Sequence, residues 1–301
     1  MQPQWDDLKV FLAVARHESL SAAGRFLKID PATVGRRIAR LEEALSAPLF
    51  AKSPQGYALT GAGQRLMVHA GRAEQEMTAA FEDLTGRGTL LSGQIRLGAP
   101  DGAANFLLPQ VCAKIVRQNP DLEVQIVALP RVVNLSRREA DMAIAVSAPS
   151  AGRLSVQKVT DYRLSLVASP QYLKSAPPIT ALRDLRAHRI VGYIQDMIFD
   201  KELDYMAEAG LPHVDLASNS VSVQFNWIRQ GAGIGMMHDF SIPFGRGMVR
   251  VLPGEVSLTR SFYLIRHVDD SRLDRLNRFA DALVQGMRRE VARLERPALD
   301  A

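Results

Sequence analysis

The stretch SLSAAGRFLKIDPATVGRRIARLEEALSAPLFAKSPQGYALTGAG, residues 19–63, decides how the N-terminal part of this 301-residue chain folds. Its second helical pattern begins at Asp30-Pro31, because aspartate caps helix N-termini and proline suits the first helical position. Apolar side chains then recur every three or four residues, which places one stripe toward a core. The stripe consists of Val34, Ile38, Leu41 and Leu45.

A shorter helix precedes this one. We expect it to begin at an N-cap Ser21 and to end in a turn at Lys28-Ile29. Its predicted buried face consists of Ala22, Ala23, Phe26 and Leu27. A first helix farther upstream has an apolar side made of Trp5, Leu8, Leu12 and Ala15. Three helices around one small core form the helix-turn-helix plan, in which the N-terminal half of the last helix faces the base edges of DNA.

Positive charge surrounds this motif. Residues 16–65 include eight basic and four acidic side chains, and this excess suits a phosphate backbone. Arginines on a helix are also often only a solvated face, and that alternative stays open for Arg36, Arg37 and Arg40 taken by themselves. The residues predicted to meet DNA are Ser21, Arg25, Pro31, Ala32, Thr33, Arg36, Arg37, Arg40, Lys52 and Gln55.

Two strand-like runs follow, 49–52 and 57–60, with a turn signal at Ser53-Pro54-Gln55-Gly56 between them, and they predict a hairpin wing beside the helix. Together with SLSAAGRFL and ATVGRRIARLEEAL, the wing sequence PLFAKSPQGYALTGAG resembles the N-terminus of LysR-type transcriptional regulators. Members commonly have serine where this chain has Gly35, and arginine where it has Lys52. The resemblance implies the mode of docking on DNA, and we expect the operator contacts to differ at these two positions.

A long helix is predicted after the wing, with Thr60 as its cap. Its apolar residues form a heptad seam of Leu66, Ala70, Ala73, Met77, Ala80 and Leu84. A seam of this length favours a partner helix, most simply that of a second copy, while packing against its own domain is the alternative. The family resemblance implies a linker helix that pairs two protomers, and it favours a dimer of dimers.

The remaining sequence alternates strands and helices, which predicts parallel βαβ units. Strands are expected at 94–98, 122–129, 141–146, 164–168, 189–193, 214–218, 233–237 and 262–266, and helices near 106–115, 132–138, 201–209, 222–230 and 272–294. The runs LGAPDGAANFLLP, NPDLEVQIV, READMAIAV, LVASPQYL and WIRQGAGIGMM resemble the effector-binding domain of the same regulators. That resemblance implies two lobes like those of periplasmic solute-binding proteins.

The expected fold class is therefore α/β overall, in three parts. A winged helix-turn-helix domain, all-α with a small β wing, is expected at 1–62, and a linker helix with a hinge at 63–92. A two-lobed α/β effector-binding domain, similar to periplasmic binding proteins, is expected at 93–301. Its first lobe would contain 93–165 and 264–301, and its second lobe 166–263.

Three loops are expected to line the junction of the lobes, because ligands bind at the carboxyl ends of strands and at helix N-termini. The predicted effector-binding residues are Pro100, Asp101, Gly102, Gln195, Met197, Ser218, Asn219 and Ser220. The charge of Asp101 would repel a carboxylate, so it predicts an effector that is neutral or carries a donor group. In the alternative interpretation, Asp101 only caps the helix that follows it.

Composition limits the other functions. The net charge of +5 and the isoelectric point near 9.5 fit a nucleic-acid partner. The single cysteine, Cys112, excludes an intrachain disulfide and is expected to be a buried structural thiol. We recognise no signal peptide, no membrane span and no metal-ligand spacing among the six histidines. The glycines at 231–235 follow a helix, which is the wrong order for a dinucleotide-binding loop.

We therefore expect a sequence-specific, DNA-binding transcriptional regulator and not an enzyme, with no cofactor. Its expected partners are double-stranded DNA, a small-molecule effector and further copies of the chain, with RNA polymerase as a candidate and the cytoplasm as its location. The alternative is an architectural or ligand-storing protein that binds DNA without sequence specificity.

Overall fold

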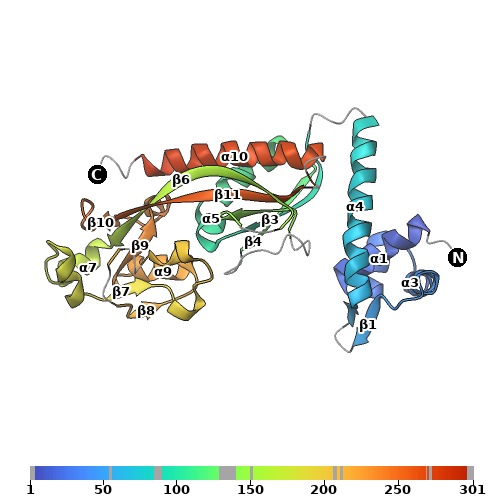
Figure 1. The fold of residues 1–301 in the computed structure, drawn as a ribbon, viewed down its shortest axis with the longest axis horizontal. Helices are drawn as coiled ribbons and strands as arrows, with labels where there is room; N and C mark the ends of the chain where they lie inside the picture. Colours follow the sequence, from blue (N-terminus) through green and yellow to red (C-terminus); the bar gives the residue numbers. More distant parts are fainter. Residues whose placement is uncertain are drawn as a thin grey trace. The chain divides into compact units, whose positions relative to one another are not determined.

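The computed structural model describes residues 4–53, 56–84, 90–128, 140–149, 152–205, 209–210, 213–268, 270 and 273–296. The chain divides into two compact units, Met1–Thr89 and Leu90–Ala301 (Figure 1). The helix predicted at 132–138 lies outside the described residues.

The first unit contains three helices, a hairpin and a long fourth helix. They are α1 (Trp5–His17), α2 (Leu20–Leu27), α3 (Pro31–Leu45), β1 (Phe50–Ser53), β2 (Gly56–Leu59) and α4 (Gly61–Leu84). Their shared core is built from α1, α3 and the wing, and includes Phe11, Val14, Val34, Leu41 and Phe50. The predicted winged helix-turn-helix arrangement is confirmed.

Local capping explains where the motif helices begin and end. The side chain of Asp30 accepts a hydrogen bond from the Ala32 amide at 2.8 Å, which confirms the predicted start of α3. The predicted cap of α2 is wrong, because Ser19, and not Ser21, accepts the Ala22 amide at 3.3 Å. Glu18 has a left-handed backbone and is the C-cap of α1. The next residue, Ser19, therefore already has the extended backbone of an N-cap.

Two side chains assigned to the first core are exposed. Phe26 is 63% exposed and contacts the ring of His17, and Leu45 at the last position of α3 is 36% exposed. Of the predicted face of α2, Ala23 is buried and Leu27 packs against the core, and Gly24 is buried as well. A Cβ at Gly24 would lie 2.8 Å from the carbonyl oxygen of Ile29, so a larger residue would push apart the turn between α2 and α3.

The seam of α4 has two environments. Ala70 is buried, and Leu66 packs against the core of the first unit, as the alternative interpretation of the seam expected. Farther along, Met77 and Ala80 are exposed. Thr60 caps the helix as predicted, because its hydroxyl accepts the Gly63 amide at 3.0 Å.

The second unit is built on one mixed sheet. The strands follow the order β4-β3-β5-β11-β6-β9-β7-β8, and β10 pairs with β6. Their bounds are β3 (Gly93–Ala99), β4 (Leu122–Ala128), β5 (Met142–Ala145), β6 (Leu154–Ala168), β7 (Ile190–Gly192), β8 (Leu216–Ala217), β9 (Ile234–His238), β10 (Val249–Arg250) and β11 (Ser257–His267). The helices are α5 (Asp101–Phe106), α6 (Leu108–Gln118), α7 (Pro170–Ser175), α9 (Val221–Arg229) and α10 (Asp274–Glu295), with 3-10 helices η2 (Leu182–Ala187), η3 (Gln195–Met197), η4 (Lys201–Leu203) and η5 (Asp239–Phe244).

Two long strands connect the lobes. β6 and β11 pair antiparallel from one end of the unit to the other (Figure 1). The first lobe adds β5, β3 and β4 at the β11 edge, and the second adds β9, β7 and β8 at the β6 edge. The parallel pairing of β3 with β4 and β5 confirms the βαβ prediction.

The predictions for β6 and β11 were shorter than the strands that the structure contains. The predictions at 164–168 and 262–266 cover only part of Leu154–Ala168 and Ser257–His267, because polar residues such as Lys158 and Asp161 interrupt the apolar pattern. Of the helix predicted at 201–209, Lys201–Leu203 form a short 3-10 helix, while Tyr205 is α-helical and its carbonyl accepts the Ala209 amide at 3.0 Å. α7 and η2 were not among the predicted elements.

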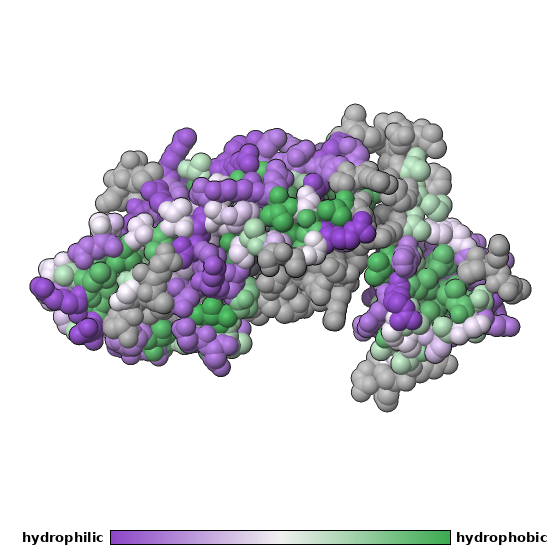
Figure 2. All heavy atoms as spheres, in the orientation of Figure 1, coloured by the Kyte–Doolittle hydropathy of each residue, from purple (hydrophilic) through white to green (hydrophobic). Residues whose placement is uncertain are grey.

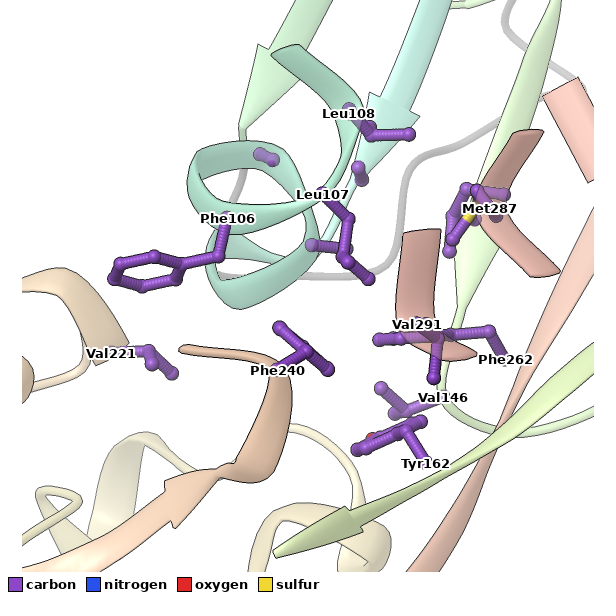
Figure 3. Close-up of a cluster of buried hydrophobic side chains, with 14 of the residues drawn as sticks. Phe106, Leu107, Leu108, Val146, Tyr162, Val221, Phe240, Phe262, Met287 and Val291 are labelled. Carbon is purple, nitrogen blue, oxygen red and sulfur yellow. The ribbon is translucent and has the colours of Figure 1, made fainter. Parts of the chain in front are cut away.

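The core of the second unit lies where α5, α6, β6, β11 and α10 meet, as Figure 3 shows. At its centre the rings of Tyr162 and Phe262 stack with centroids 4.1 Å apart. On the face drawn in Figure 2, purple hydrophilic side chains interrupt the green hydrophobic patches of this unit. Within the described part of the chain, no helix is long and apolar enough to cross a membrane.

Two glycines of α4 give a matched test of the packing between this helix and the wing. A Cβ at Gly63 would lie 2.2 Å from the carbonyl oxygen of Leu49, whereas a Cβ at Gly71 meets nothing within 4 Å. We expect Gly63→Ala to lower the free energy of unfolding by about 2 kcal/mol, because backbone must shift. Gly71→Ala should raise it by up to about 1 kcal/mol through helix propensity.

Urea unfolding followed by the fluorescence of Trp5, in a Trp227→Phe background, measures both changes in the first unit. Equal changes in the free energy of unfolding for the two substitutions would show that α4 is not closely packed against the backbone at Leu49, just before β1.

Candidate functional site

The first candidate surface is the N-terminal half of α3. Pro31, Ala32 and Arg36 are exposed, and Thr33 is half-buried. The Arg36 guanidinium donates a hydrogen bond from Nη2 to Thr33 Oγ1 at 2.7 Å. This contact holds the arginine on the exposed face of the helix without neutralising its charge. A planar guanidinium in this position can donate two hydrogen bonds to a guanine edge in a major groove.

Arg40, which was also predicted to meet DNA, is held by a carboxylate of α1. Its Nε donates to Asp7 Oδ2 at 2.8 Å, and its Nη2 donates to Asp7 Oδ1. The Asp7 carboxylate is buried, so this ion pair ties α3 to α1, and the hydrogen bond that Arg40 donates to Asp7 raises the pKa of Arg40. Arg37 is 3.9 Å from the exposed carboxylate of Asp6. Arg36 is therefore the best placed of the three arginines to meet DNA.

The wing is fixed to the helices by hydrogen bonds that cross elements. Glu42 of α3 accepts the amides of Leu49 and Phe50 at 2.7 and 3.2 Å, and the Glu18 carbonyl accepts the Tyr57 amide at 2.9 Å. The hairpin therefore has a defined position beside α3. Lys52 lies on β1, its side chain being outside the described set, and Gln55 lies outside the described residues.

Three further positions of the predicted DNA surface can be placed. Ser21 and Arg25 are exposed on α2. Gly35 is half-buried, and a Cβ there would meet only Leu20 Cδ1, at an ordinary 3.5 Å. The backbone thus has room for the serine that the resembled family commonly carries, and the glycine is not required by packing.

The second candidate site is the junction of the lobes, where Asp101 holds three hydrogen bonds at one carboxylate oxygen. Oδ2 accepts the Ser222 amide at 2.8 Å, the Ser222 hydroxyl at 3.0 Å and the Ser220 hydroxyl at 3.2 Å. Oδ1 accepts from the Asn105 amide group at 3.2 Å. The alternative that Asp101 caps its own helix is wrong, because its carboxylate binds the N-terminus of α9 and makes no cap bond to α5.

The residues before α9 form a small network around this contact. Ser218 Oγ accepts the Ser220 amide at 3.1 Å, and the buried Gln224 donates to the Ser218 carbonyl at 2.7 Å. Ser220 is the N-cap of α9, because it accepts the Val223 amide at 3.3 Å. The structure therefore brings Ser218 and Ser220 together with Asp101. Ser222 and Gln224 were not among the predicted effector residues, although both belong to the first turn of the predicted helix.

The other predicted effector residues have fewer contacts. Met197 is 46% exposed on η3, and the Gln195 side chain donates to Asp204 at 3.5 Å. Pro100 holds the N-cap position of α5. Asn219 is half-buried before α9.

Gly102 is required by a buried histidine. A Cβ at Gly102 would lie 2.7 Å from His238 Cε1. The His238 ring stacks on Phe240 with centroids 4.8 Å apart, and its Nδ1 has no hydrogen-bond partner among the described residues. Complete burial lowers the pKa of His238 to about 3, so the ring is neutral at physiological pH.

Thiol and metal chemistry have little support in the described residues. Cys112 is buried on α6, and burial raises the pKa of its thiol to about 11, which makes it a poor nucleophile. Over the described ranges, no three histidine, cysteine, aspartate or glutamate side chains gather as metal ligands.

Comparison with known families matches both units. Residues 5–64 match the bacterial regulatory helix-turn-helix protein, lysR family, and residues 88–288 match the LysR substrate binding domain. Together the two matched segments cover most of the chain.

Curated relatives and solved structures agree with these matches. The chain is 30% identical over 258 residues to the transcriptional activator TtdR of Escherichia coli, covering 83% of both proteins. It is 27% identical over 255 residues to the transcriptional regulator PtxR of Pseudomonas aeruginosa, covering 82% of this chain and 81% of the relative. The fold is similar to that of CrgA from Neisseria meningitidis, a LysR-type transcriptional regulator, with a TM-score of 0.56 at 23% identity, covering 94% of this chain and 98% of that one.

The buried histidine predicts a pH dependence of stability. His238 has a folded-state pKa of about 3 against an ordinary value of 6.5, so below the ordinary value the unfolded chain binds a proton that the folded chain does not. Stability is therefore lost as the pH falls. Between about pH 7 and pH 5 we expect a loss of about 2 kcal/mol from this group.

The measurement compares urea unfolding of the wild type and His238→Phe at the two pH values, followed by Trp227 fluorescence in a Trp5→Phe background. The variant should lose about 2 kcal/mol less than the wild type. The same pH dependence in both proteins would show that His238 titrates in the folded state as it does in water.

Proposed function

The chain belongs to the LysR family of DNA-binding transcriptional regulators with an effector-binding domain, and we propose that it reads its operator through the first half of α3. The exposed pair of Arg36 and Thr33 supports this proposal most strongly, since its hydrogen bond presents a charged guanidinium on the helix face that enters the groove. The proposed DNA-binding residues are Ser21, Arg25, Pro31, Ala32, Thr33, Arg36, Arg37, Lys52 and Gln55. Arg40 leaves this set because Asp7 already binds its guanidinium on two oxygens.

We further propose that the chain acts as a dimer of dimers. The divided seam of α4 supports the pairing of two copies, because Leu66 and Ala70 serve the core of their own unit while Met77 and Ala80 are exposed. The family resemblance favours the further step to a dimer of dimers. An exposed seam favours the same helix from a second copy. Ala73 and Leu84 complete the proposed pairing face. Two copies held in this way would place two α3 helices on a two-fold related DNA site.

A small-molecule effector is proposed to bind at the junction of the lobes and to change how the protomers associate on DNA. Its proposed contacts are Pro100, Asp101, Gly102, Gln195, Met197, Ser218, Asn219 and Ser220. We propose a cytoplasmic binding protein and not an enzyme, with RNA polymerase as a further partner, because the curated relatives are transcriptional regulators. The same relatives speak against the architectural alternative.

Arg36 and Arg40 make a matched pair for testing the operator contact. If Arg36 reads a guanine, Arg36→Ala should weaken binding to the operator by about 1–3 kcal/mol and relax discrimination at one base pair. Arg40→Ala should instead lower the free energy of unfolding, because it leaves the buried Asp7 carboxylate unpaired.

Fluorescence anisotropy on the intergenic DNA beside the protein's own gene, with single base-pair variants and a scrambled duplex, measures the affinities. Urea unfolding measures the stability. Uniform weakening of Arg36→Ala on every duplex would contradict base reading and would make Arg36 a phosphate contact.

A further inference from the structure

The Asp101 carboxylate crosses from one lobe to the other. Asp101 is the first residue of α5 and follows β3 in the first lobe, while its three donors on Oδ2 come from Ser220 and Ser222 at the start of α9 in the second. The partners are 119 and 121 residues apart in the sequence. The contact is therefore a tertiary bridge between the lobes and not a local turn.

The chemistry of this bridge is that of a bound anion. The first amides of a helix have no partner within the helix, and the helix dipole favours negative charge at that end. In this chain the Ser222 amide and two hydroxyls of the α9 N-terminus all donate to one carboxylate oxygen. Hydrogen bonds to an ionised acceptor are about twice as strong as neutral ones. The place that a carboxylate ligand would take is occupied by the chain's own side chain.

An aromatic contact accompanies the carboxylate on the same short helix. The Phe106 ring at the end of α5 is 4.9 Å from the Phe225 ring of α9 and 5.6 Å from the Phe244 ring of η5, measured between centroids. Figure 3 shows Phe106 extending from α5 toward the segment that carries Val221, on a different side from Leu107. Both ends of α5 thus hold the second lobe, one by charge and one by apolar packing.

A second polar bridge joins the lobes from the neighbouring strand. The Ser147 hydroxyl, just after β5, donates to the Asp200 carboxylate at the start of η4. β3 and β5 are parallel neighbours, so Asp101 and Ser147 both leave the carboxyl edge of the first-lobe sheet. The two lobes are consequently joined by side chains as well as by β6 and β11.

We propose that Asp101 is a tethered anion that fills the N-terminus of α9, holds the two lobes together without an effector, and excludes small carboxylates from this end of the junction. The carboxylate and Phe106 act as one clasp, because they occupy the two ends of a six-residue helix. An effector that uses this end must displace Asp101 from its donors or donate a hydrogen bond to it. That requirement selects neutral or cationic molecules with donor groups. The selection rests on the proposed effector function, whereas the clasp itself does not.

Hydrogen exchange tests the clasp in the full-length chain without DNA or effector. Asp101→Asn keeps the shape but removes the charge, and Asp101→Ser removes both. We expect the Ser222 amide to exchange at least about tenfold faster in Asp101→Ser than in the wild type, with Asp101→Asn between them. Asp121→Asn is the matched control, since it removes one exposed carboxylate from the same lobe, in the turn before β4. Unchanged exchange in both Asp101 variants would overturn the clasp.

Malonate tests the exclusion of small carboxylates. We expect it to slow exchange at Ser222 and to raise the melting temperature in Asp101→Ser, and to do neither in the wild type or in Asp121→Asn. An equal response of the wild type and Asp101→Ser, whether both respond or neither does, would overturn the exclusion. Because both readouts are made on the protein without DNA, their failure is distinguishable from a failure of operator binding.

Discussion

The antiparallel pairing of β6 with β11 is the constraint on which the second unit depends. The two strands pair from Leu154 with His267 to Ser165 with Ser257, and each lobe adds its own strands to one edge of this pair. The backbone hydrogen bonds of this pair, whose register shifts once between Phe262 and Tyr263, restrict how far the lobes can separate, while the side-chain contacts between them decide how they meet. Asp101, Phe106 and Ser147 supply such contacts, and all of them come from segments that the central pair brings together.

Charged side chains of the first unit divide into two roles. Asp7 and Glu42 are used internally, one to hold Arg40 and the other to hold the start of the wing. Arg36 interacts with a neutral hydroxyl and keeps its charge on the surface. A buried carboxylate costs free energy unless it is paired, so the arginine that pairs with it stabilises the fold. Helical position alone does not separate these roles, because Arg36, Arg37 and Arg40 all lie on α3.

Sequence reasoning worked best where one physical signal decides the structure within a few residues. Asp30-Pro31 and Thr60 were read correctly as helix starts because a cap needs only a side chain and an amide two or three positions away. It failed at Ser21, where two serines compete and the left-handed Glu18 makes Ser19 the cap. It failed at Phe26, which is exposed, because the buried face of α2 is the one that carries Ala23 and Gly24. The predictions for β6 and β11 were too short because exposed positions within both strands carry polar side chains. These polar residues interrupt the apolar pattern although the strand continues through them.

By itself, then, the sequence determined the helix-turn-helix with its wing, the long helix after it, the alternation of strands and helices, and the family to which these patterns belong. All of these rest on periodicity, capping and turn chemistry, which act over short stretches of chain. Only the tertiary structure decided that Arg40 pairs with Asp7, 33 residues away, and that the Asp101 carboxylate binds the start of α9 and not its own helix. The physical reason is that a charged side chain takes the best donor or acceptor that the fold brings to it, and its sequence neighbours do not reveal which one that will be.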